Sequence, residues 1–224
     1  MEVFPFSLLA GIDDAGRGSV IGPLVIAGVL IETDKLRLLK ALGVKDSKLL
    51  SSSKRRLLAS QIKDLAMEVI YVIIDPRRID EIVFRGKKLH RLNYLEAEAM
   101  ANIVRRLNPD VVYVDAPDIL EKRFGETIQA LLPYRVKIVS KHYADKKYPI
   151  VSAASIMAKV KRDELIEKLR ARYGDFGSGY PTDLKTRKFL LEWLKKHGSY
   201  PDFVRKSWKT ARTLMNELMQ KHLM

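Results

Sequence analysis

Cysteine is absent from the sequence. Its absence excludes a disulfide framework, a thiolate metal site and a cysteine nucleophile. Long hydrophobic runs are also lacking, since the longest apolar stretch, residues 20–31, is too short to span a bilayer and contains Gly22, Pro23 and Gly28. No basic segment followed by an apolar one opens the chain, as a secretory signal would. We therefore expect a cytoplasmic protein that does not interact with membranes.

Repeats, low-complexity tracts and linkers rich in glycine, serine or proline are absent as well. A chain of 224 residues buries roughly 70–75% of its unfolded surface, so its core needs no cross-links. These features favour one large domain with at most a modest appendage. No strand pattern follows Tyr173, so we expect the main domain to occupy residues 1–173 and a helical extension to occupy residues 174–224.

The charge balance is strongly positive. The chain has 41 lysine and arginine residues against 27 aspartate and glutamate residues, which gives a net charge of +14. Residues 183–224 alone hold ten basic residues against four acidic ones. Such an excess favours a polyanion such as nucleic acid as the partner, although it also suits anionic membranes, ribosomal assembly or simple solubility.

Hydrophobic patterning predicts an α/β fold. Two adjacent strands near the start are followed by alternating helices and strands, which favours a mixed sheet with helices on both faces. The expected strands are residues 7–12, 23–31, 69–74, 111–114 and 136–139. The expected helices are residues 51–67, 93–107, 150–173, 186–196 and 208–223.

Four aspartates occupy informative positions. Asp13 and Asp14 close the first strand, Asp115 closes the strand 111–114, and Asp145 comes just before the long helix. Carboxylates that converge at one sheet edge repel each other, and Mg²⁺ or Mn²⁺ relieves this repulsion while binding phosphate oxygens. Two such ions, roughly 3.5–4 Å apart, activate a water and stabilise the departing oxygen of a phosphodiester. Taken singly, each aspartate is more often a turn or cap residue.

A series of motifs runs along the chain: Gly11-Ile12-Asp13-Asp14-Ala15-Gly16-Arg17-Gly18 and residues 21–25, 44–48, 114–116, 144–145, 148–149, 152–156, 158–159, 162–163, 177–183 and 207–208. Together these motifs resemble those of ribonuclease HII, in particular its archaeal members. The resemblance covers nearly the whole chain in the expected order. It implies a ribonuclease H-like fold, with a mixed five-stranded sheet flanked by helices and a C-terminal helical extension that contributes to substrate binding.

The resemblance also implies the reaction. Members of the family are endonucleases that hydrolyse the RNA strand of RNA–DNA hybrids and nick duplex DNA on the 5′ side of an embedded ribonucleotide. The products carry 3′-hydroxyl and 5′-phosphate ends, and two divalent ions, Mg²⁺ or Mn²⁺, serve as cofactors. Residues at the positions of the family's metal-binding and catalytic acids are Asp13, Asp14, Asp115 and Asp145. We expect the enzyme to act as a monomer.

Substrate contacts follow from the same resemblance. The Gly16-Arg17-Gly18 segment matches the one that contacts the ribonucleotide's 2′-hydroxyl, and Tyr180 matches a tyrosine that packs on the adjoining sugar. Glycines on both sides of Arg17 let the backbone approach a sugar closely, and the 2′-hydroxyl distinguishes RNA from DNA. Without the resemblance, Tyr180 would read as a core residue of a glycine-rich loop.

A second group of candidate contacts lies before the first long helix. Phosphate oxygens are expected to bind to Lys45, Ser47 and Lys48. A solvated loop explains these three residues nearly as well.

The last helix has an apolar stripe, at Met215 and Leu218 for example, that packing against the body explains more simply than a sliding clamp. A clamp is therefore a partner that the sequence leaves unsupported.

One departure from the family pattern concerns the acids. Asp14 stands where the family usually has glutamate, and the missing methylene retracts the carboxylate by about 1.5 Å. Mg²⁺ demands near-ideal octahedral geometry, so we expect Asp14 to remain a ligand with some loss of rate or a greater preference for Mn²⁺. Two alternatives stay open: a nucleic-acid-binding protein of this fold with weakened catalysis, and a structure-selective DNA nuclease of the wider superfamily.

Overall fold

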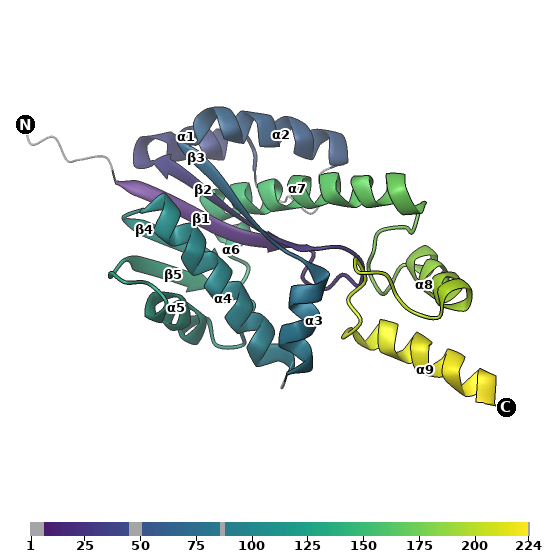
Figure 1. The fold of residues 1–224 in the computed structure, drawn as a ribbon. Helices are drawn as coiled ribbons and strands as arrows, with labels where there is room; N and C mark the ends of the chain where they lie inside the picture. Colours follow the sequence, from purple (N-terminus) through teal and green to yellow (C-terminus); the bar gives the residue numbers. More distant parts are fainter. Residues whose placement is uncertain (1–6, 45–50, 86–87, 224) are drawn as a thin grey trace, which may run out of the picture. The chain divides into compact units, whose positions relative to one another are not determined.

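The structure is a computed structural model that describes residues 7–44, 51–85 and 88–223 (Figure 1). Within these residues five strands form one sheet in the order β3-β2-β1-β4-β5. The strands are β1 (Leu8–Ala15), β2 (Leu24–Glu32), β3 (Glu68–Ile74), β4 (Val111–Asp115) and β5 (Lys137–Lys141). The helices are α1 (Leu36–Ala41, after a 3-10 turn at Thr33–Lys35), α2 (Ser52–Leu65), α3 (Pro76–Phe84), α4 (Lys88–Leu107), α5 (Glu121–Ala130), α6 (Ala144–Lys147), α7 (Pro149–Tyr173), α8 (Leu184–His197) and α9 (Lys209–Leu223).

The sheet is mixed, which confirms the expected fold class. β1 pairs antiparallel with β2, and it pairs parallel with β4 on its other side. β4 in turn pairs parallel with β5. Parallel pairing aligns the ends of β1, β4 and β5, so residues at their carboxyl ends emerge at the same edge of the sheet.

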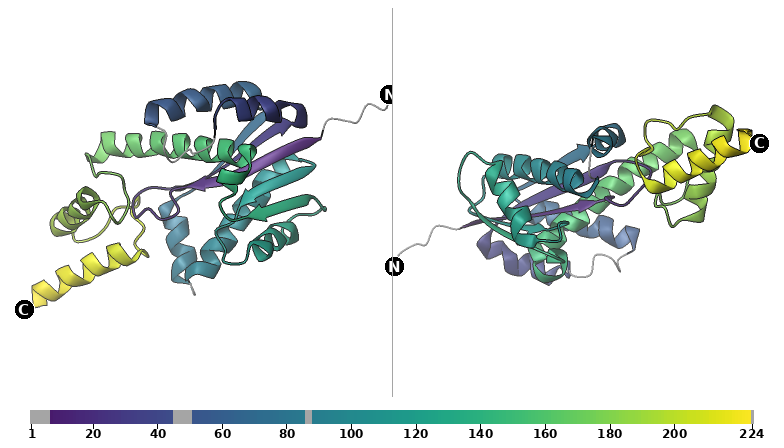
Figure 2. Two further views of the ribbon diagram at one scale, coloured as in Figure 1. Left: turned by 180° about the vertical axis from the view of Figure 1, so that it is seen from behind. Right: turned by 90° about the horizontal axis from the view of Figure 1, so that it is seen from below.

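Helices cover both faces of this sheet. A Cβ atom at Gly11 would lie 2.3 Å from the carbonyl oxygen of Ile150 in α7, and one at Gly28 would lie 2.2 Å from Cγ2 of Ile103 in α4. Gly28 is the register partner of Ile12, the neighbour of Gly11. Because consecutive strand residues face opposite sides, α7 and α4 pack on opposite faces (Figure 1; Figure 2). β2 is accordingly buried along its length up to Ile31.

The described residues form two compact units. One unit consists of residues 7–15, 25–44, 51–72 and 93–161 and contains most of the sheet, and the other consists of residues 16–24, 73–85, 88–92 and 162–223. In the second unit the aromatic residues Tyr173, Phe176 and Phe203 pack together, with ring centroids 4.4 Å apart for Tyr173 and Phe203. The division into a main domain over residues 1–173 and an extension over residues 174–224 stays a prediction.

The observed elements refine the sequence prediction at their ends. β1 continues through Asp13 and Asp14 to Ala15. The dipeptide Asp75-Pro76, which ends the strand as expected, also starts α3, because proline is favoured in the first turn of a helix. Helices α1, α3, α5 and α6 were absent from the prediction.

Within the described residues, no helix combines the length and apolar character needed to cross a membrane.

Candidate active site

The candidate site in the first unit is built around Asp13. This residue lies near the end of β1, with its side chain on the face covered by α7, and only 5% of its surface is exposed. Burial, reinforced by the negative charges of Asp14 and Asp115, raises the pKa of Asp13 well above its ordinary value. The Asp14 backbone N–H donates to Asp13 Oδ1 over 2.7 Å and partly offsets this effect. Three carboxylates, from the ends of the adjacent strands β1 and β4, thus interact electrostatically.

Two further residues support Asp13 from α7. The hydroxyl of Ser155 hydrogen-bonds the Asp13 carboxyl group, and Ser155 is itself buried. Lys159 Nζ, one turn further along α7, donates to Ser155 Oγ over 2.9 Å. The sequence motif contains both residues, but their role requires the packing of α7 on β1. Ser155 and Lys159 are therefore part of the site that sequence reasoning missed.

A backbone hydrogen bond links Asp115 to the segment that carries Asp145. Asp115 ends β4, next to β1, where the register partner of Val114 is Ile12. Its Oδ1 accepts a hydrogen bond of 2.6 Å from the backbone N–H of Ala144, the residue before Asp145. Asp145 lies in the short helix α6, just before α7 as expected, and 7% of its surface is exposed. The structure therefore brings Asp115 to the segment that carries Asp145.

Asp14 leaves β1 in a different direction from Asp13. Consecutive side chains of a strand point to opposite faces, so Asp14 starts on the face of the sheet opposite to Asp13. Within the described residues, no three Asp, Glu or His side chains lie close enough to enclose a metal ion by themselves. The electrostatic contact between Asp14 and Asp13 is nevertheless strong enough to raise the pKa of Asp13.

The chemistry of these groups suits a hard divalent cation. All four candidates are carboxylates, and Mg²⁺ and Mn²⁺ prefer oxygen ligands. A bound cation would also relieve the unfavourable burial and repulsion that raise the pKa of Asp13. The donor set thus fits a metal of this type, with further oxygen ligands supplied from outside the chain.

The predicted sugar-contacting segment lies in the second unit. Gly16 has φ 87°, and a Cβ there would lie 2.2 Å from Nε of the buried Arg162, so only glycine fits. Its carbonyl oxygen accepts hydrogen bonds from the backbone N–H and the hydroxyl of Ser19, at 3.2 and 2.8 Å. Buried Arg205 fixes the next residue, because its Nη1 donates to the Arg17 carbonyl oxygen over 2.9 Å. The turn is therefore rigidly held.

Tyr180 lies beside this turn, as expected of a residue that acts with it. A Cβ at Gly18 would be 4.0 Å from the Tyr180 ring. The guanidinium of Arg162 lies over the same ring, 5.0 Å from its centroid. The backbone N–H groups of Val20 and Ile21 both donate to the carbonyl oxygen of Gly179, at 2.8 and 3.1 Å. Tyr180 is 37% exposed, so its ring remains accessible.

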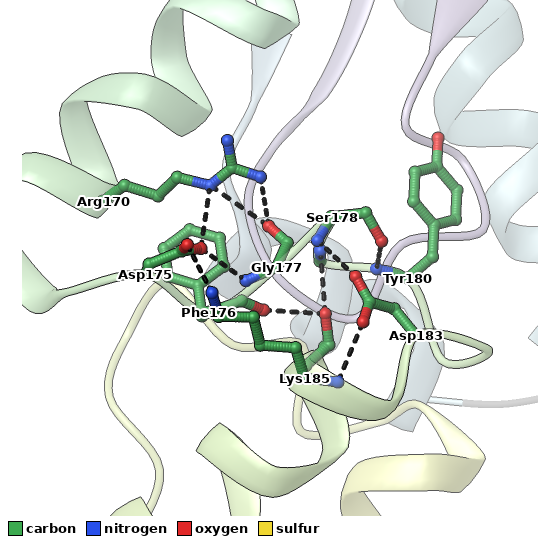
Figure 3. Close-up of polar contacts among 10 residues, drawn as sticks. Arg170, Asp175, Phe176, Gly177, Ser178, Tyr180, Asp183 and Lys185 are labelled. Atoms are coloured by element: carbon green, nitrogen blue, oxygen red, sulfur yellow. Dashed lines mark hydrogen bonds and ion pairs between the residues drawn. The ribbon is translucent and has the colours of Figure 1, made fainter.

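A network of polar contacts shapes the loop that carries Tyr180 (Figure 3). The Asp183 carboxylate accepts hydrogen bonds from the backbone N–H groups of Ser178 and Lys185, at 2.6 and 2.9 Å. Contacts led by the Ser178 N–H and hydroxyl lower the pKa of Asp183 to about 2. The hydroxyl of Thr186 belongs to the same network and donates to the Phe176 carbonyl oxygen over 2.8 Å. In Figure 3 the Tyr180 ring points away from this network.

The remaining predicted contacts, Lys45, Ser47 and Lys48, lie outside the residues that the structure describes. Their assignment to substrate phosphates stays a prediction.

The chain is similar to known proteins over nearly its whole length. The family model for Ribonuclease HII matches residues 10–211. The ribonuclease HII of Pyrococcus abyssi is 48% identical over 220 residues, covering 96% of this chain and 94% of that protein. The crystal structure of the ribonuclease H2 from Pyrococcus horikoshii OT3 has a TM-score of 0.88 at 43% identity, covering 95% of this chain and 99% of that chain. The Archaeoglobus fulgidus protein in a PCNA:RNase HII complex has a TM-score of 0.83 at 42% identity, and the match covers 92% of this chain and 96% of that chain.

The mixed sheet with helices on both faces is thus shared with solved ribonucleases, and the class of protein is that of the ribonuclease H hydrolases. The family match narrows this class further. The chain belongs to the ribonuclease HII family, which confirms the resemblance read from the sequence. It is accordingly an endonuclease of the ribonuclease H type that acts on nucleic acid.

Proposed function

We propose that the chain nicks duplex DNA on the 5′ side of an embedded ribonucleotide and cleaves the RNA strand of RNA–DNA hybrids, leaving 3′-hydroxyl and 5′-phosphate ends. Asp13, Asp115 and Asp145 hold two divalent ions, Mg²⁺ or Mn²⁺, with Asp14 assisting. The observation that carries this proposal is the buried Asp13 carboxylate, repelled by two neighbouring carboxylates in a protein of net charge +14. A buried carboxylate beside two partly buried ones is stabilised by a cation, and the basic chain attracts a polyanion.

Neighbouring groups of the chain orient the carboxylates of Asp13 and Asp115. Ser155 and the Asp14 N–H hold the Asp13 carboxylate, and the Ala144 N–H holds that of Asp115. When bound, the divalent ions supply an activated water and stabilise the departing oxygen. Phosphate oxygens of the substrate complete the ligand set, which agrees with a site that has no three enclosing side chains within the described residues.

Selection of a ribonucleotide rests on the second unit. Gly16, Arg17 and Gly18 present backbone groups to the 2′-hydroxyl, with Arg205 holding the Arg17 carbonyl group in place. Tyr180 places its flat ring against the adjoining deoxyribose, where a further hydroxyl would be crowded. Because Gly16 follows Asp14 by two residues, sugar recognition and catalysis are joined in one short stretch of chain.

The proposal is tested with a labelled DNA duplex that contains one ribonucleotide. We expect a single nick 5′ of the ribonucleotide in Mg²⁺ or Mn²⁺, a product end that a polymerase extends, and no nick in EDTA. An all-DNA duplex and an all-DNA branched substrate should stay intact. Cleavage of the branched substrate would favour a structure-selective DNA nuclease, and binding without cleavage would favour the weakened binding protein.

Asp14→Glu tests the contribution of the shortened acid. The side chain at position 14 starts on the face of the sheet opposite to Asp13. Glutamate there would extend the carboxylate by about 1.5 Å. We expect the nicking rate in Mg²⁺ to rise between about threefold and thirtyfold, with a smaller gain in Mn²⁺, because Mg²⁺ is stricter in its geometry. Single-turnover rates of both proteins in both metals provide the measurement. Equal rates for the two proteins in each metal would show that Asp14 is not a ligand.

A further inference from the structure

Tyr143 has an unusual backbone conformation. Within the described residues, Tyr143 and Asn108 are the two non-glycine residues with positive φ, at 53° and 45°. Asparagine adopts this left-handed conformation readily, whereas a bulky residue such as tyrosine does so rarely. Tyr143 has ψ 38°, in the centre of the left-handed region. A residue in this conformation persists only where its surroundings hold it.

The residue before Tyr143 is firmly anchored. The backbone N–H of His142 donates to Glu121 Oε1 over 2.7 Å. The two ring nitrogens of His142 lie 3.1 and 3.3 Å from the carbonyl oxygens of Ala116 and Ile119. These contacts fix the chain to the loop that follows β4.

The residues after Tyr143 are anchored as well. The Ala144 N–H donates to Asp115 Oδ1 over 2.6 Å, and the Lys146 N–H donates to the Tyr143 carbonyl oxygen over 3.0 Å. Tyr143 is thus held from both sides. Its neighbours impose the left-handed conformation, and the direction of its side chain is set by the same contacts that orient Asp115.

Packing does not explain why a tyrosine occupies this position. Its side chain is 63% exposed, so folding gains little from the ring. The ammonium group of Lys146 lies over the ring, 5.3 Å from its centroid, and both Lys146 and Lys147 are exposed. An accessible aromatic face with a cation beside it is a combination that binds nucleic acid.

We infer that Tyr143 and Lys146 form an additional substrate contact, in which the ring packs against a sugar of the nucleic-acid backbone and the ammonium group binds a neighbouring phosphate. This inference rests on the proposed function. Bases are stacked inside a duplex, which leaves sugars and phosphates as the groups that this pair reaches. The contact adjoins the candidate site, since Ala144 links Tyr143 to Asp115.

The contributions of the Tyr143 ring and the Lys146 ammonium group are separated by measuring binding of the single-ribonucleotide duplex. The measurement uses fluorescence anisotropy in EDTA over a series of salt concentrations. Tyr143→Gly and Tyr143→Asn remove the ring and both accept positive φ. We expect each to weaken binding about fivefold, because the apolar contact of the ring with a sugar is lost, without changing the slope of affinity against salt. Lys146→Gln should reduce that slope by about one, because one phosphate contact is lost.

A matched control is available at Asn108. Asn108→Gly also relieves a left-handed residue, in the loop before β4, and we expect it to bind the duplex like the parent protein. Tyr143→Gly should melt at the same temperature as the parent or higher, so weaker binding would not reflect a damaged fold. Parent-like binding by both Tyr143 variants would overturn the inference. Failure of the parent protein to bind or nick the duplex would instead count against the proposed function.

Discussion

Asp13→Asn is expected to abolish strand cleavage, lowering the single-turnover nicking rate at least about a thousandfold, or about 4 kcal/mol of barrier. Asn has the shape of the aspartate but neither its charge nor its affinity for a hard divalent ion. The Asp13 carboxylate is also the one whose buried charge interacts with both Asp14 and Asp115. Its loss therefore affects every part of the proposed metal site, whereas the surfaces that bind the duplex remain.

The same substitution should leave the fold intact or stabilise it. Burial and repulsion raise the pKa of Asp13, which means that the ionised group disfavours the folded state. We therefore expect Asp13→Asn to melt no lower than the parent protein and to bind the duplex with equal or greater affinity. Asp64→Asn, an exposed site on α2, is the control and should cleave normally. A variant of Asp13 that nicks at the parent rate would rule out the assignment.

The sequence predicted the architecture well because its strands carry strong hydrophobic patterns. β2 is buried on both faces, and its unbroken apolar run is what a central strand requires. Three of the four helices that were missed, α1, α3 and α6, are short or begin at a residue typical of turns. α6 has four residues, and α3 starts at Pro76, which also reads as the end of a strand. Local pattern alone does not distinguish these cases.

The candidate site was predicted in part for a similar reason. An aspartate at the end of a strand is visible in the sequence, and so Asp13 and Asp115 could be singled out. Their proximity depends on the pairing of β1 with β4, which is a long-range contact. Ser155 lies on a helix whose approach to β1 no local pattern encodes, and the left-handed conformation of Tyr143 is imposed by its neighbours. These features depend on tertiary structure.

Gly11→Ala is expected to destabilise the protein severely, although it adds only one methyl group. The added Cβ would lie 2.3 Å from the Ile150 carbonyl oxygen and 2.8 Å from the Val151 backbone nitrogen. Backbone atoms of a helix cannot rotate away as a side chain can, so α7 must move off β1. We expect a loss of about 3 kcal/mol or more and a decrease in Tm of about 10 °C, measured by thermal denaturation.

The displacement should also affect the site, because α7 carries Ser155. Moving α7 away from β1 would lengthen the hydrogen bond between Ser155 and Asp13, so the nicking rate of Gly11→Ala should fall even well below its Tm. Gly18→Ala is the control for stability, since its Cβ would make only an ordinary contact, 4.0 Å from the Tyr180 ring. Its Tm should remain within about 2 °C of the parent value. If Gly11→Ala melted equally close to the parent, α7 and β1 would not be in the close contact on which the support of Asp13 depends.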